Sequence, residues 1–175
     1  MNKTFRLVFI SLLAAQALLL YGIESLIPLP FIAPGAKLGL ANLITVIALY
    51  TLPSKKDVLG VLFLRLLLSA LFFGGLSAFI YSVAGAALSF LSMIAVKEFG
   101  RDKVSIIGVS AAGAVFHHIG QLLVASAIVE NTALMLYLPL LSAAGIGTGI
   151  FIGIAANFAV RHLEKLPVFR NLSAQ

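Results

Sequence analysis

Long stretches of the chain carry almost no charge. Residues 131–160 contain no charged side chain, and residues 58–96 contain only Arg65. A helix that crosses a bilayer needs about 20 predominantly apolar residues, so each stretch is longer than a single span. Of all 175 residues, 61% are hydrophobic and 10% are charged, against about 45–50% and about 25% in soluble domains. We therefore predict an all-α integral membrane protein.

Charged segments and Gly/Pro breaks divide the chain into apolar segments. We predict a single domain over residues 1–175, a six-transmembrane-helix bundle with short loops. The expected helices cover residues 5–27, 36–52, 57–73, 76–97, 104–129 and 140–163, and the first external loop covers residues 28–37. Pro28, Pro30 and Pro34 mark that loop, because proline removes a helical hydrogen-bond donor. Pro139 indicates a short external segment before the last helix.

Basic residues lie almost entirely on one side of this arrangement. That side holds Lys3, Arg6, Lys55, Lys56, Lys97, Arg101, Lys103, Arg161, Lys165 and Arg170. The other side holds Lys37. By the positive-inside rule we expect both termini in the cytoplasm, and hence a multi-pass protein. The run Ala15-Gln16-Ala17 also fits a signal-peptide cleavage site, but the apolar stretch continues to Ile23 and favours an intact first helix.

Charged residues within the apolar segments are candidate functional residues, because burying a charge without a partner is costly. Arg65 is expected about 12 Å into the membrane from the basic side. It indicates an internal anion contact or a subunit contact, or else a snorkelling side chain or an ion pair within the bundle. Glu24 is expected near the outer end of the first helix, where it could pair with Lys37 or contact a ligand.

The run PGAKLGLAN, residues 34–42, places irregular backbone at the head of a short helix. Unpaired N–H groups give a helix N-terminus a partial positive charge. With Lys37 beside it, this segment is suited to a phosphate or carboxylate, and Asn42 would add an amide contact. The alternative is a capped re-entrant turn whose Asn42 bonds a neighbouring helix.

Small and polar residues recur at every fourth position in the last three predicted helices. The stripes are Ser77, Tyr81, Gly85 and Ser89; Gly113, His117 and Gln121; and Gly145, Gly149, Gly153 and Asn157. Small residues at this spacing let backbones approach, so we expect the glycines to pack against other helices. His117 and Gln121 share one face, either as buried packing residues or as ligand contacts. His118 points about 100° away, so we expect no metal site.

Common catalytic and cofactor motifs are absent from the sequence. There is no G-x-x-x-x-G-K-[ST] loop, so the chain is not expected to use ATP alone, and there is no H-E-x-x-H. The acidic residues are Glu24, Asp57, Glu98, Asp102, Glu130 and Glu164, and they never cluster. We therefore expect no magnesium–diphosphate site, no catalytic residues, no bound cofactor and no enzymatic activity. The net charge of +6 indicates orientation and contact with anionic lipid, not nucleic-acid binding.

Two segments resemble a known family. Residues 24–30, ESLIPLP, followed by residues 34–42, look like the signature of the Gx transporter family, and residues 117–121 and the chain length fit it. Members are also named heptaprenyl diphosphate synthase component I. The family is similar to the substrate-binding S components of energy-coupling factor (ECF) vitamin transporters, which are small six-helix proteins whose first loop gates an outward pocket.

The resemblance implies the substrate-binding subunit of an importer in the bacterial cytoplasmic membrane. Its partners would be a membrane coupling protein and two ATPases, and ATP would be used by those partners. The ligand would be a vitamin, flavin, quinone or isoprenoid precursor, with an anionic head if Lys37 contacts it. The expected ligand contacts are Glu24, Lys37, Asn42, Tyr81, His117, Gln121 and Asn157.

S components dock the coupling protein through a face of small residues on the first helix. Here Ser11, Ala14 and Ala15 resemble a degenerate version of that face, and Arg65 is a further docking candidate. Two alternatives stay open. The chain could be a non-catalytic membrane partner of a soluble prenyl diphosphate synthase, as the family name implies. It could also be a small membrane scaffold whose polar stripes serve only packing.

Overall fold

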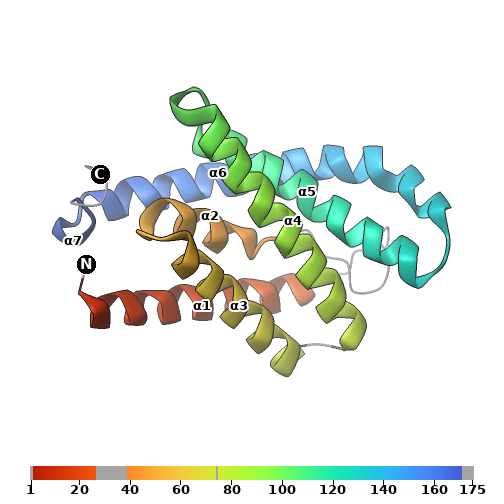
Figure 1. Ribbon diagram of the computed structural model, residues 1–175, viewed down its shortest axis with the longest axis horizontal. Coiled ribbons are helices and arrows are strands. Elements are labelled where there is room, and N and C mark those ends of the chain that lie inside the picture. The colour runs from red at the N-terminus through yellow and green to blue at the C-terminus, as the bar shows by residue number, and fades with distance from the viewer. Residues whose placement is uncertain (1, 27–38, 74, 171–175) are drawn as a thin grey trace.

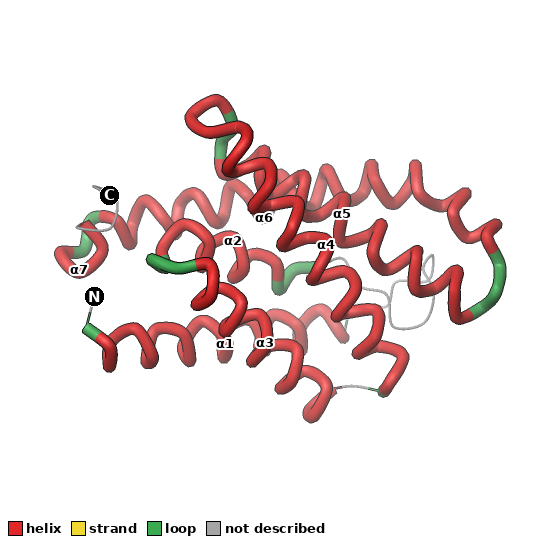
Figure 2. The backbone as a smooth tube through the Cα atoms, viewed as in Figure 1, coloured by secondary structure: helices red, strands yellow, loops and turns green. Residues whose placement is uncertain are grey.

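The computed structural model describes residues 2–26, 39–73 and 75–170, and the elements within these ranges are helical (Figure 1, Figure 2). The longer helices are α1 (Lys3–Ser25), α3 (Lys55–Phe73), α4 (Leu76–Gly100), α5 (Ile106–Ile128) and α6 (Leu138–Glu164). The shorter elements are α2 (Asn42–Thr51), α7 (Pro167–Arg170) and the 3-10 turns η1 (Arg101–Lys103) and η2 (Thr132–Tyr137). The prediction of an all-α chain is confirmed for the described residues.

Helix boundaries follow the predicted breaks except at the start of α2. The sequence predicts a start at residue 36, whereas α2 begins at Asn42. Gly39 has a φ of +87°, in the left-handed region, so a right-handed helix cannot run through it. The predicted first loop, residues 28–37, lies outside the described residues. Pro139 lies in the first turn of α6, where no intrahelical donor is needed.

The short helix α2 is the central element of the bundle. It packs against α1, α3, α4, α5 and α6, and most of its residues are buried. A helix that is apolar all round is typical of such a position. Around it, α5 packs extensively against both α4 and α6, and α1 packs mainly against α3.

The glycine stripe of α6 lies against the backbone of α5. A Cβ atom added to Gly149 would lie 2.6 Å from the Cα of Ala111, and one added to Gly153 would lie 2.6 Å from the Cα of Ile107. No side chain fits at these distances without separating the helices. The stripe therefore permits close helix packing, as predicted.

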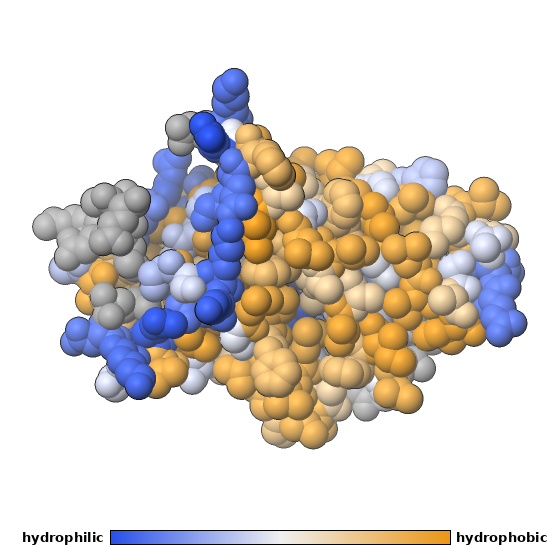
Figure 3. Space-filling view, in the orientation of Figure 1, coloured by the Kyte–Doolittle hydropathy of each residue, from blue (hydrophilic) through white to orange (hydrophobic). Residues whose placement is uncertain are grey.

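Apolar helices dominate the described structure. Four described segments are long and apolar enough to cross a membrane, namely Lys3–Ser25, Ala78–Gly100, Ile106–Ile128 and Thr132–Glu164. The ten residues of α2 rise only about 15 Å, which is half of the hydrocarbon thickness. Apolar surface covers most of the face seen in Figure 3. These features indicate a membrane protein, while the six spans and the cytoplasmic termini stay predictions.

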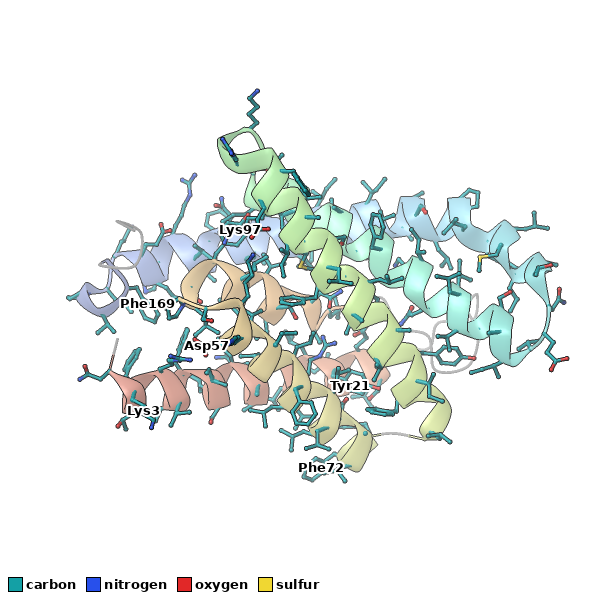
Figure 4. All side chains as sticks on the ribbon, viewed as in Figure 1. Lys3, Tyr21, Asp57, Phe72, Lys97 and Phe169 are labelled. Atoms are coloured by element: carbon teal, nitrogen blue, oxygen red, sulfur yellow. The ribbon has the colours of Figure 1, made fainter. Side chains whose placement is uncertain are left out.

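The start of α1 and the short α7 lie at the same end of the molecule (Figure 1). The ring of Phe169 in α7 packs against Phe5 and Phe9 of α1, with ring centroids 5.8 and 5.0 Å apart. Arg6 forms an ion pair with the buried Asp57 at the start of α3 (Asp57 is labelled in Figure 4). Hydrophilic residues gather toward this end in Figure 3. It is the end that holds the basic residues of α1 and α3, as the sequence predicts.

Candidate functional site

A buried carboxylate joins the end of α1 to the start of α2. Glu24 is 2% exposed. The backbone N–H of Gly39 donates to Glu24 Oε1 at 2.5 Å, and the N–H of Leu40 donates to Glu24 Oε2 at 3.1 Å. Both donors belong to irregular backbone just before α2, at the partly positive end of that helix. Glu24 thus forms a carboxylate cap, from another helix, on the turn that leads into α2. It pairs backbone N–H groups that would be costly to bury without a partner.

This geometry differs from the expected anion site. The sequence predicts that N–H groups at the head of α2 hold a phosphate or carboxylate of a ligand, but those of Gly39 and Leu40 hold the chain's own carboxylate. An anionic ligand group would have to displace Glu24 from them. The predicted contacts of Lys37, to Glu24 or to a ligand, lie outside the described residues.

Arg65 supplies a positive charge inside the bundle. Its side chain is 3% exposed on α3, and it interacts electrostatically with Glu24 and Tyr21 of α1. Of the predicted roles, an electrostatic interaction within the bundle fits this position. The docking role of Arg65 stays a prediction. Removing either charge would leave the other buried with less compensation.

Asn42 has an unsatisfied amide next to this carboxylate cap. It is 2% exposed, and neither its Nδ2 nor its Oδ1 has a hydrogen-bond partner in the described part of the chain. A Cβ added to Gly39 would lie 3.0 Å from Asn42 Nδ2 and 3.1 Å from His117 Cδ2. The two side chains therefore flank Gly39. The capped-turn alternative, in which Asn42 bonds a neighbouring helix, does not hold for the described residues.

The predicted pair on α5 is buried in the same region. His117 is 4% exposed and Gln121 is 3% exposed, and their Nε2 atoms lie 3.1 Å apart. An amide nitrogen only donates, so His117 Nε2 accepts this bond. On its other side the His117 ring fills the space beside Gly85 of α4, where an added Cβ would lie 2.7 Å from His117 Cε1. The glycine at position 85 thus makes room for the imidazole.

These contacts define one group of side chains, which we call the polar cluster. Its members are Glu24, Asn42, Arg65, His117 and Gln121, from α1, α2, α3 and α5. It combines a carboxylate, a guanidinium, two amides and an imidazole within an otherwise apolar bundle. These groups offer hydrogen-bond donors and acceptors in a low-dielectric surrounding, where each such bond is strong.

Two residues of this region were not predicted, and two predicted residues do not join it. The hydroxyl groups of Tyr21 and Ser82 lie 3.4 Å apart and connect α1 to α4 (Tyr21 is labelled in Figure 4). Tyr21 precedes Glu24 by about one helical turn, and that spacing could have identified it. Tyr81 is buried and Asn157 is half-buried. Among the described residues, no hydrogen bond links either of them to the polar cluster.

His118 faces a different neighbour from His117. It is fully buried, and a Cβ added to Gly145 of α6 would lie 2.8 Å from its Cδ2. The two imidazole rings are 6.0 Å apart and steeply inclined to each other. Within the described ranges there is no group of three or more His, Cys, Asp or Glu side chains that could hold a metal ion.

The predicted docking face on α1 is only partly at the surface. Ser11 and Ala15 are exposed, whereas Ala14 is 2% exposed and packs inside the bundle. Residues four apart share a helix face, but Ala14 is rotated by about 100° from Ala15. Ala14 thus lies on another face than Ser11 and Ala15, and a docking role for these three residues stays a prediction.

A family model described as heptaprenyl diphosphate synthase component I matches residues 13–159. The matched range includes every member of the polar cluster. No curated protein and no solved structure matches the chain.

Proposed function

The chain belongs to the heptaprenyl diphosphate synthase component I family, and on that premise we propose that it is the substrate-binding membrane subunit of an ECF-type importer. In this proposal it resembles an S component, its ligand is a small organic molecule, and partner ATPases supply the energy. It spans the bacterial cytoplasmic membrane six times. It performs no chemistry on the ligand and binds no cofactor of its own.

The observation that carries the proposal is the buried amide of Asn42, which has no hydrogen-bond partner among the described residues. A buried amide without hydrogen bonds costs about 1–3 kcal/mol, and membrane proteins satisfy such groups internally. Asn42 lies at the head of the central helix, beside His117. A bound molecule whose polar end meets this amide would remove the cost, so the site would be more stable when filled.

The charges of the described cluster suggest what kind of molecule this is. Arg65 and Glu24 offset each other inside the bundle, and Asn42 and Gln121 are neutral amides. This part of the site would therefore bind a ligand through directed hydrogen bonds and not through a net charge. An amide, a ring nitrogen or a carbonyl on an otherwise apolar molecule fits best, as in a flavin-like or quinone-like ligand.

Affinity purification from native membranes in mild detergent tests both parts of the proposal. We expect a membrane coupling protein and ATPases to copurify, and a small molecule to be retained and identified by mass spectrometry. Asn42→Ala should raise the Kd for that molecule about tenfold, which corresponds to about 1.4 kcal/mol, and should lower the amount retained. Ser110→Ala is the matched control, because Ser110 is also buried and unpartnered but lies on the α5 face that packs against α6. Equal retention by both variants would refute the site.

The second candidate function is a non-catalytic membrane subunit of a heptaprenyl diphosphate synthase, and the family description favours it. The partner would then be a soluble synthase subunit that supplies the catalytic aspartates. Copurification of such a subunit without ATPases would establish this candidate and overturn the importer proposal.

A further inference from the structure

A cleft lies at the opposite end of α2 from the polar cluster. It has a volume of about 390 Å³ and is bounded by the end of α2, the start of α3 and the end of α4. Leu49, Val58 and Ile94 form part of an apolar wall. The ten residues of α2, about 15 Å, separate this cleft from Asn42. The two sites are therefore independent.

Charged side chains form the rest of the cleft lining, and they are predominantly basic. They are Lys55, Lys97, Glu98 and Arg101. Glu98 forms an ion pair with Lys55. The excess charge in the cleft is therefore positive and is carried by Lys97 and Arg101.

Lys97 is held in place within the cleft. Its Nζ donates to the backbone carbonyl of Leu49 at 2.6 Å and lies 4.1 Å from the centre of the Tyr50 ring (Figure 4). The carbonyl belongs to the last turn of α2, where the helix has its partial negative charge, so Lys97 offsets that charge. An ammonium group has three donors, and further donors stay available for an anion.

The cleft has exposed basic side chains at its mouth and buried apolar side chains along its wall. Lys55 and Arg101 are exposed, whereas Val58 is 1% exposed and Leu49 is 6% exposed. The cleft lies at the basic end of the bundle, where the positive-inside rule places the membrane surface. An occupant would thus meet cations at its head and aliphatic side chains along its body.

We propose that this cleft binds the phosphate head group of an anionic amphiphile. Lys97 and Arg101 contact the phosphate, Lys55 neutralises the neighbouring Glu98, and Leu49, Val58 and Ile94 contact the apolar chain. Such a molecule can come from two sources. It is either an acidic phospholipid of the surrounding leaflet or a prenyl diphosphate that arrives from the water. Free phosphate would leave the apolar wall uncovered.

Titration of the purified full-length chain in a neutral maltoside detergent tests the proposal. Farnesyl diphosphate is the probe, and farnesol is the control that lacks the phosphates. The variants are Arg101→Gln and Lys55→Gln, with Lys56→Gln as the matched control, because Lys56 is exposed and does not line the cleft. Lys97 is kept because it also contacts the end of α2.

We expect Arg101→Gln and Lys55→Gln each to raise the Kd for farnesyl diphosphate about fivefold or more, and Lys56→Gln to change it less than about twofold. Adding phosphatidylglycerol to the micelles identifies the source. Displacement of the probe indicates a bilayer lipid, and no displacement indicates a diffusible diphosphate. Either result supports the cleft. Undetectable binding, equal binding of farnesol, or an equal effect of Lys56→Gln would overturn the proposal.

Discussion

Replacing Glu24 by glutamine tests the carboxylate cap at the head of α2. Glu24→Gln keeps the shape of the side chain but replaces one carboxylate oxygen by an NH2 group, which cannot accept a hydrogen bond. One of the two N–H donors, of Gly39 or Leu40, then loses its acceptor. The substitution also removes the negative charge that interacts with Arg65.

The expected loss follows from these two effects. A hydrogen bond to a charged group contributes about 1.5–3 kcal/mol, and breaking a buried ion pair by removing one partner costs about 3–5 kcal/mol. Because one carboxylate serves both interactions, the two figures overlap and are not added. We expect Glu24→Gln to lower the free energy of unfolding by about 3–5 kcal/mol, a large part of the usual about 5–15 kcal/mol.

The assay is titration of the detergent-purified chain with sodium dodecyl sulfate, followed by far-ultraviolet circular dichroism. Glu164→Gln, at the exposed end of α6, is the matched control and should change the free energy by less than about 0.5 kcal/mol. Adding Arg65→Met to Glu24→Gln should recover at least about 1 kcal/mol, because it removes the uncompensated charge. A loss below about 1 kcal/mol would refute the carboxylate cap. No recovery in the double variant would refute the electrostatic interaction between Glu24 and Arg65.

Three further substitutions probe other contacts with the same unfolding assay. Gly149→Ala places a Cβ 2.6 Å from the α5 backbone and should lower the free energy of unfolding by about 1–3 kcal/mol. Its control is Gly147→Ala, whose Cβ meets open space and should be neutral or stabilising by up to about 1 kcal/mol. Equal effects of the two substitutions would contradict the close packing. Gly39→Ala must hold a side chain at a φ of +87° and should cost about 1–3 kcal/mol; an unchanged midpoint would contradict the left-handed turn. Asp57→Asn removes the ion pair with Arg6 and should cost about 1 kcal/mol or more; wild-type stability would show that this pair contributes nothing.

The helices could be predicted because each is a local property of the sequence. Apolar runs, charged breaks and Pro139 give the boundaries of α3 to α6 to within a few residues. The i+4 spacing of glycines likewise predicts a helix contact, since residues four apart share a face. The contact partner on α5 was not predictable, because spacing within one helix contains no information about which neighbour it meets.

The sequence predicted the residues of the candidate site better than it predicted the contacts between them. His117 and Gln121 bond within one helix, so their pairing follows from sequence spacing. Glu24 instead reaches backbone fifteen residues further along the chain, and a backbone donor leaves no signature in the sequence. The sequence does not decide whether Arg65 faces a partner subunit or the interior of the bundle, because the rotation of α3 relative to α1 depends on packing.

The central place of α2 has a consequence for how the chain enters the membrane. A ten-residue helix that rises about 15 Å cannot be released sideways into lipid by itself, because its ends would carry unpaired backbone groups into the hydrocarbon. Its neighbours are the helices α1, α3, α4, α5 and α6, and all of these except α1 are synthesised after it. We therefore expect α2 to be shielded from lipid during translation until these later helices have been made. Insertion of this protein would then include the delayed placement of a segment from the first third of the chain.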